Sequence, residues 1–166
     1  MREQKLHSFE QSLLDSISRI ESIKSNQNII IAISGGKDSM ALLYGMIKLN
    51  HILKLNLVAV HINHHIRKDS TADELFVKEF CDLNDIEIII DHLDPNKKSK
   101  DMSTEEWARE FRYKSLYKIS SDYNSCHIIT AHHGNDQIET ILFHLSQGTG
   151  ITGLRGIHSK RDRLIR

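Results

Sequence analysis

The chain has 166 residues, 39% of them hydrophobic, a length and composition that suit one folded domain and exclude global disorder. Its 22 basic and 22 acidic residues cancel, so no overall field indicates a nucleic acid or a membrane as a partner, and any such contact requires a local patch. A polar amino terminus, no apolar run near the roughly 20 residues of a membrane span, and two cysteines outside any CxxC pair predict a cytoplasmic protein without membrane contact.

Helices and strands are expected to alternate along the chain. Apolar residues three and four apart predict an amphipathic helix over 3–24, and we expect residues 1–28 to pack on the domain as an amino-terminal helical segment. The β-branched run at 28–33 predicts a strand buried on both faces. Further strands are predicted at 55–62, 86–91 and 126–131, and helices at 40–49, 72–83, 104–121 and 135–145. A capping-box-like sequence, Ser103-Thr104-Glu105-Glu106, precedes the third of these helices. In the helix at 72–83, the residues expected to face the core are Leu75, Phe76, Phe80 and Leu83.

This alternation predicts an α/β fold, a Rossmann-like parallel sheet with helices on both faces. In such sheets, ligands bind at the carboxyl ends of the strands, near a switch in strand order. Three polar segments directly follow predicted strands, at 34–36, 61–65 and 132–133. The functional site is therefore expected at that edge of the sheet.

The segment from Ser34 to Ser39 reads SGGKDS and follows the first predicted strand. Its glycines let backbone N–H groups approach an anion, and the N-terminus of the next helix adds partial positive charge. Lys37 adds a charge, the serine hydroxyls add hydrogen bonds, and Asp38 suits Mg²⁺ because hard cations take oxygen ligands. A plain strand-to-helix turn capped by Asp38 or Ser39 is the alternative, and we favour phosphate binding.

Five histidines lie near the carboxyl ends of two predicted strands. The five histidines are His61, His64, His65, His132 and His133. The first three are followed by Arg67, Asp73 and Glu74. A zinc site is one interpretation, but no cysteine lies nearby and no HExxH arrangement is present, so polar side chains lining a cleft are favoured.

Two later segments carry further charged candidates. Arg109 and Arg112 are three residues apart on one predicted helix face, where they suit a polyphosphate or an RNA backbone, or else form salt bridges with neighbouring glutamates. The segment ITAHHGNDQIET at 129–140 places Asp136 and Glu139 on the first turns of a helix. There a carboxylate suits Mg²⁺ or a general base, although an acid at this position also simply complements the helix dipole.

Together these segments resemble the tRNA(Ile)-lysidine synthetases, members of the PP-loop (N-type) ATP pyrophosphatase superfamily. The resemblance runs in order from about 29 to 157, through SGGKDS, HINHHIR, EEWAREFRY, TAHHGNDQIET and GTGITGL. It implies an adenine nucleotide alpha hydrolase-like fold for the PP-loop adenylation domain at 29–157. It also implies a longer protein in which 158–166 begin a linker to carboxy-terminal domains.

The resemblance implies a ligase that uses ATP and Mg²⁺. ATP would activate C2 of the wobble cytidine of the CAU-anticodon tRNA(Ile) as an adenylate, with release of pyrophosphate. The amine of free L-lysine would then attack C2 and release AMP, giving lysidine and changing decoding from AUG to AUA. The oligomeric state stays open, with a homodimer as one option.

Residue by residue, the resemblance implies two overlapping sets. The ATP-binding set is Ser34, Gly35, Gly36, Lys37, Asp38 and Ser39. The catalytic set is Asp38, Arg109, Arg112, His133, Asp136 and Glu139, with Asp38 and Asp136 as magnesium ligands. The family's AHHxDD segment has Asn135 here in place of its first acid, which leaves more of the metal or base role to Asp136. RNA contact is expected from Lys97, Lys98 and Lys100 and from Arg155, Lys160, Arg161, Arg163 and Arg166.

Two other functions compete with this interpretation. A tRNA thiolase uses the same adenylation, but such enzymes typically carry paired cysteines, which the isolated Cys81 and Cys126 do not supply. A non-catalytic ATP-binding module would retain ATP without releasing pyrophosphate, and it leaves the segment at 129–140 unexplained.

Overall fold

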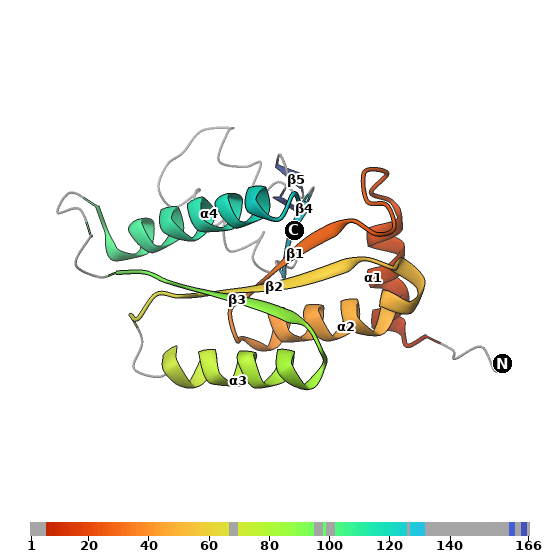
Figure 1. Ribbon diagram of the computed structural model, residues 1–166, viewed down its shortest axis with the longest axis horizontal. Coiled ribbons are helices and arrows are strands. Elements are labelled where there is room, and N and C mark those ends of the chain that lie inside the picture. Colours follow the sequence, from red (N-terminus) through yellow and green to blue (C-terminus); the bar gives the residue numbers. More distant parts are fainter. Residues whose placement is uncertain are drawn as a thin grey trace, which may run out of the picture.

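The computed structural model describes residues 6–66, 70–94, 98, 102–125, 127–131, 160–161 and 164–165. Their strands form a six-stranded sheet in the order β3-β2-β1-β4-β6-β5 (Figure 1). The strands are β1 (Asn28–Ile33), β2 (Asn56–Asn63), β3 (Glu87–His92), β4 (His127–Thr130), β5 (Lys160–Arg161) and β6 (Leu164–Ile165). All neighbouring strands pair in parallel except β5, which runs antiparallel to β6. The predicted parallel sheet is confirmed.

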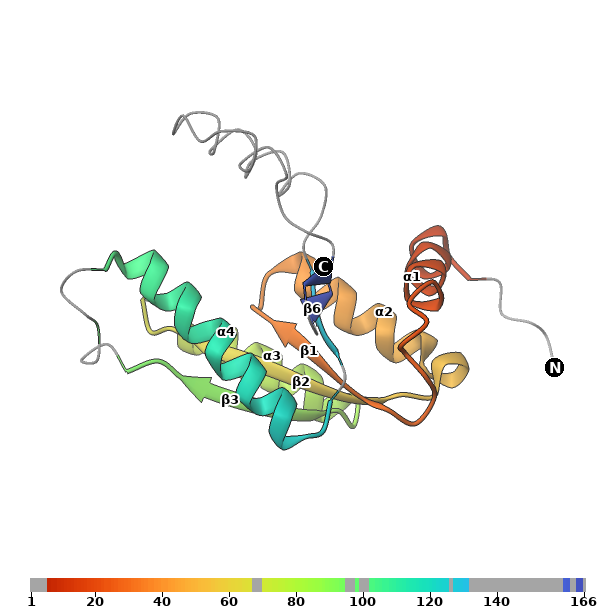
Figure 2. The ribbon, with the colours of Figure 1, turned by 90° about the horizontal axis from the view of Figure 1, so that it is seen from above.

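Helices cover both faces of this sheet, as predicted. They are α1 (Ser8–Ser18), α2 (Lys37–Leu53), α3 (Ser70–Leu83) and α4 (Thr104–Asp122). Figures 1 and 2 show α2 and α3 on one face and α4 on the other. Helix α1 is shorter than the expected 3–24 and packs on α2 over Gly45, where an added Cβ would lie 2.7 Å from Leu13 Cδ2. Within the described part of the chain, no helix is both long and apolar enough to cross a bilayer.

Strand β1 lies at the centre of the core. Ile29 and Ile31 pack with α2 on one side of the sheet, whereas Ile30 packs with Leu116 of α4 on the other. Ile29, Ile30 and Ile31 are fully buried, and each contributes about 1.5–3 kcal/mol by leaving water. The run of β-branched residues therefore marks a strand buried on both faces, as the sequence predicted.

The orientation of α3 differs from the prediction. Its fully buried residues are Val77 and Cys81, whereas Leu75, Phe76 and Leu83 are more than half exposed. The prediction that these three side chains face the core is therefore wrong. Phe80, the fourth residue of the prediction, is partly buried against the same core as Val77 and Cys81, so α3 packs through the stripe that these three residues form.

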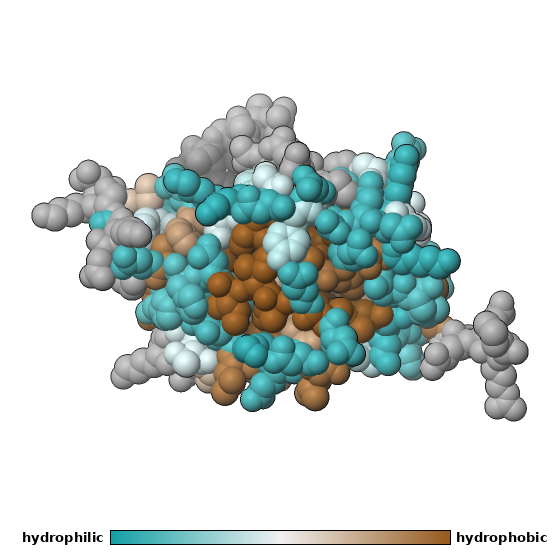
Figure 3. Space-filling model, in the orientation of Figure 1, coloured by the Kyte–Doolittle hydropathy of each residue, from teal (hydrophilic) through white to brown (hydrophobic). Residues whose placement is uncertain are grey.

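Helix α4 begins at the predicted capping box. Ser103 Oγ accepts from Glu106 N, and Ser103 N donates to Glu106 Oε2, each at 3.2 Å. The hydrogen bond from Ser103 holds the pKa of the Glu106 carboxyl below its ordinary value. Further along, Ser115 donates to Asp91 and Tyr123 donates to Glu87, so α4 is tied to the edge strand β3. In Figure 3 the surface over β3, between α4 and α3, is hydrophobic.

The segment 158–166, expected to begin a linker, contributes strands β5 and β6 to the sheet. Leu164 and Ile165 are buried and pair in parallel with Ile128 and Ile129 of β4. Burial of these two side chains beside β4 accounts for their place in the sheet. Several residues expected to contact RNA lie outside the described residues: Lys97, Lys100, Arg155, Arg163 and Arg166.

The thiol of Cys81 is expected to be inert in the folded protein. It is fully buried, and burial raises its pKa to about 11, so the thiolate is scarce at neutral pH. In a Cys126→Ser background, we expect native Cys81 to react with Ellman's reagent roughly 100-fold more slowly than in denaturant. Because folding raises the pKa of this thiol, its contribution to the free energy of unfolding is fully present below about pH 9. That contribution is lost as the pH rises through about 11. Equal rates in the native and denatured protein would contradict this expectation.

Candidate functional site

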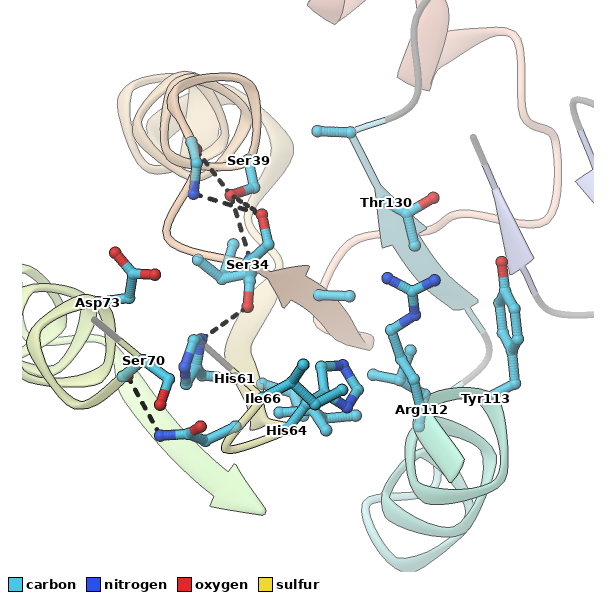
Figure 4. Close-up of a pocket in the computed structure, with 18 of the residues that line it drawn as sticks. Ser34, Ser39, His61, His64, Ile66, Ser70, Asp73, Arg112, Tyr113 and Thr130 are labelled. Atoms are coloured by element: carbon cyan, nitrogen blue, oxygen red, sulfur yellow. Dashed lines mark hydrogen bonds between the residues drawn. The ribbon is translucent and has the colours of Figure 1, made fainter. Parts of the chain in front are cut away.

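A cavity of about 550 Å³ opens at the carboxyl ends of the central strands. Its walls come from the ends of β1, β2 and β4, the first turns of α2 and α3, and one face of α4 (Figure 4). Strand β1 lies between β2 and β4, so the chain order along the sheet switches direction beside it. The site therefore lies at the predicted edge of the sheet, at a topological switch point.

The SGGKDS segment forms a closed loop at one end of this cavity. Ser39 Oγ donates to the Gly36 carbonyl at 2.9 Å, and Ser34 N donates to Ser39 Oγ at 3.2 Å (Figure 4). Gly35 has a φ of +83°, and a Cβ added there would lie 3.2 Å from Asp73 Cβ. Gly36 is the N-cap of α2, so the N-terminus of this helix begins at the loop. Such a loop suits an anionic ligand.

Four of the six residues predicted to bind ATP line the cavity: Ser34, Gly36, Asp38 and Ser39. Gly35 lies outside the lining and contributes the positive φ that turns the loop. Lys37 is exposed and also lies outside the lining. Asp73, at the first turn of α3, lines the same cavity; the sequence pattern placed it after the histidines but gave it no role in binding ATP or Mg²⁺. Its position at the start of the helix after β2 was the available signal, because this also puts it at the carboxyl edge of the sheet.

The donors in this cavity fit Mg²⁺. Asp38 and Asp73 offer carboxylates, and Ser34 and Ser39 offer hydroxyls, all of them the oxygen ligands that this ion prefers. Across the described ranges, no group of three or more His, Cys, Asp or Glu residues is arranged to hold a metal. One or two carboxylates completed by phosphate oxygens is the usual protein arrangement for Mg²⁺, so these residues would hold it together with a nucleotide.

The end of β2 supplies the histidine wall. His61 is 4% exposed, and its Nδ1 lies 2.9 Å from the carbonyl oxygen of Ile33. Ile33 is the last residue before the SGGKDS loop. Since a carbonyl only accepts, Nδ1 carries the proton and His61 braces the strand end that leads into SGGKDS. His64 and His65 also line the cavity, as expected of polar residues in a cleft.

Helix α4 supplies the basic wall. Arg112 lines the cavity together with Tyr113, whereas Arg109 is exposed and outside the lining (Figure 4). Both guanidinium groups lie over the Tyr113 ring. The Cζ atom is 5.3 Å from the ring centroid for Arg109 and 5.5 Å for Arg112. The two arginines therefore share a helix face, as predicted, but only one of them reaches the cavity.

The remaining predicted site residues lie outside the described residues. They are His132, His133, Asn135, Asp136 and Glu139. Thr130 and Ala131, the last described residues before them, line the cavity.

The parallel sheet, the glycine loop at its switch point and the two carboxylates beside that loop define an α/β nucleotide-binding protein. The PP-loop domain family matches residues 4–166, and the chain belongs to this family. It is 40% identical over 155 residues to a tRNA(Ile)-lysidine synthase from Clostridium tetani, covering 92% of this chain and 33% of that protein. It is 37% identical over 153 residues to the synthase of the same name from Clostridium acetobutylicum, covering 90% and 33%.

The chain thus spans about a third of the length of the curated relatives it matches. Among solved structures, a U34-tRNA thiolase from Methanococcus maripaludis, which holds a [4Fe-4S] cluster, superposes with a TM-score of 0.70. That match covers 86% of this chain and 53% of the thiolase at 20% identity, so it shows the shared fold alone.

Proposed function

We propose that this chain is the ATP-binding part of a tRNA(Ile)-lysidine synthetase, a cytoplasmic ligase. It would join L-lysine to C2 of the wobble cytidine of the CAU-anticodon tRNA(Ile) and release pyrophosphate and AMP. The observation that carries the proposal is one cavity that joins the SGGKDS loop, two carboxylates and Arg112. This cavity belongs to a chain up to 40% identical to proteins of that name.

The cavity suits the adenylation step. Backbone N–H groups at the start of α2 and the guanidinium of Arg112 would bind the phosphate oxygens of ATP. As pyrophosphate leaves, negative charge develops on it, and these fixed donors stabilise that charge without having to reorganise. Mg²⁺ held by Asp38 and Asp73 would supply further charge neutralisation when bound.

The ligation step needs a base, because the lysine amine must lose a proton in order to attack C2. We keep His133, Asp136 and Glu139 as the candidates for this base, with Asp136 as the second predicted magnesium ligand. Expulsion of AMP would again place negative charge where the loop and Arg112 donate.

A tRNA thiolase is less well supported. Cys81 is fully buried and burial raises its pKa to about 11, so it suits neither a persulfide carrier nor a cluster ligand. The chain contains one other cysteine, Cys126, and two separated cysteines cannot hold a cluster through three or four thiolates.

The test uses ATP labelled at the α-phosphate, Mg²⁺, L-lysine and tRNA(Ile) with an unmodified CAU anticodon. We expect labelled AMP only when both the tRNA and lysine are present. The full-length Clostridium tetani relative runs beside this chain as the reference. Labelled ADP, or ATP that stays bound without turnover even in the full-length protein that contains this chain when both substrates are supplied, would overturn the proposal. Retention without turnover would favour a non-catalytic ATP-binding module.

A further inference from the structure

A strained turn follows β2 at the rim of the cavity. His65 has a φ of +51°, in the left-handed region that residues other than glycine adopt uncommonly and that Asn, Asp and His adopt most often among them. Its N–H donates to Asn63 Oδ1 at 2.9 Å. Asn63 is 2% exposed, and its Nδ2 donates to the Ser70 carbonyl at 3.2 Å and to Glu74 Oε2 at 2.7 Å. A buried amide thus holds this turn against α3.

The turn brings His65 beside His92, the last residue of β3. The two rings have centroids 5.1 Å apart and planes inclined by 17°, and His65 Nε2 lies 3.0 Å from His92 Nδ1. A nitrogen separation of 3.0 Å is too short for rings lying face to face. The rings therefore meet edge to edge through one N–H···N hydrogen bond. We call this nearly flat surface the histidine platform.

The histidine platform is open to solvent and continuous with the cavity. His65 is exposed and lines the cavity, and the His92 side chain is 51% exposed. Ile66, the next residue, is also 51% exposed and lines the same cavity (Figure 4). Glu74 Oε2, which accepts a hydrogen bond from Asn63 Nδ2, lies 3.7 Å from His92 Nδ1. The buried Asn63 therefore fixes the turn that carries His65 at the rim of the cavity.

We propose that the histidine platform stacks an unpaired base of the anticodon loop, an inference that rests on the proposed tRNA substrate. Single-stranded RNA is recognised largely by stacking splayed bases on flat aromatic and histidine side chains. Two coplanar imidazoles form a flat surface comparable to a base. Because the platform borders the cavity that holds the SGGKDS loop, a base stacked there would present its neighbour in the loop to the bound ATP.

The platform fits a base better than it fits a metal ion. The two facing nitrogen atoms are engaged with each other, whereas a metal would need a lone pair from each. In the part of the chain that the structure describes, His65, His92 and Glu74 are not arranged as a metal-holding group.

The test measures the affinity of a CAU anticodon stem-loop RNA that carries 2-aminopurine beside the wobble cytidine. His65→Asn removes the ring while keeping a residue that tolerates the left-handed backbone, and His92→Ala removes the second ring. Each is expected to weaken binding by about 10-fold and to leave the slope of log K against log salt unchanged, because stacking contacts no phosphate. His92→Phe keeps a flat ring and is expected to stay within about 3-fold of the unaltered chain.

His51→Ala is the matched control, since His51 is an exposed histidine on α2 outside the cavity lining. It is expected to change neither RNA affinity nor ATP affinity. The inference is overturned if the unaltered chain does not bind the RNA, or if His65→Asn and His92→Ala bind like it. An effect that needs added Zn²⁺ and disappears with chelator also overturns it. AMP formation is assayed separately, so a failed platform with intact turnover, and a working platform without turnover, are told apart.

Discussion

Replacing Gly35 with alanine is expected to weaken ATP binding by about 100-fold, through a loop that can no longer keep its shape. Gly35 has a φ of +83°, a conformation that costs an L-residue roughly 1–2 kcal/mol. The new Cβ would also lie 3.2 Å from Asp73 Cβ, so relief of that contact has to move either the loop or the start of α3. Both movements displace groups that line the cavity. Titration calorimetry with Mg²⁺-ATP measures the loss.

The neighbouring glycine provides the matched control. Gly36 has an ordinary φ of −72°, and a Cβ added there would meet only Ser34 Oγ, at 3.4 Å. Gly36→Ala is therefore expected to shift the free energy of unfolding by less than about 0.5 kcal/mol, against about 1–2 kcal/mol for Gly35→Ala. If the two variants had the same free energy of unfolding and the same loss of ATP affinity, the glycines would serve close approach of the phosphate and not the shape of the loop.

Local signals in the sequence predicted the parts of the fold that depend on neighbouring residues. The β-branched run at 28–33 located β1, and Ser103 with Glu106 marked the start of α4. The site at the carboxyl ends of the strands followed from the alternation of helices and strands. Each of these predictions needs only periodicity or a hydrogen bond within one turn, and such information is complete within a short segment.

Contacts between distant segments were not accessible in this way. Asp73 lies against Gly35 although 38 positions separate them, and no pattern in either segment encodes that contact. Helix α3 carries two apolar stripes, and only packing against the sheet decides that Val77 and not Phe76 is buried. Strand β6 has two residues, too few for any periodic signal, and depends on pairing with β4.

Arg112→Ala is expected to lower kcat/KM for AMP formation by about 100-fold, the usual scale for losing one fixed donor to a developing charge. Arg112 lines the cavity, whereas Arg109, three residues earlier and against the same Tyr113 ring, is exposed outside it. Arg109→Ala removes the same charge and a similar ring contact, so it is expected to cost less than about 3-fold. Arg112→Lys is expected to recover only part of the rate, because an ammonium cannot bind phosphate in a bidentate manner.

The comparison of these two arginines separates transition-state stabilisation from RNA attraction. A side chain that donates hydrogen bonds to the phosphates of ATP in the cavity acts on kcat at saturating tRNA. A side chain that contacts RNA acts through KM and changes the salt dependence of binding. If both alanine variants raised KM equally and left kcat intact, the two arginines would form one external RNA-binding pair. The cavity would then need another cation to meet the charge of the leaving pyrophosphate. Lys37 is exposed beside the loop, so Lys37→Ala would be the next variant to measure.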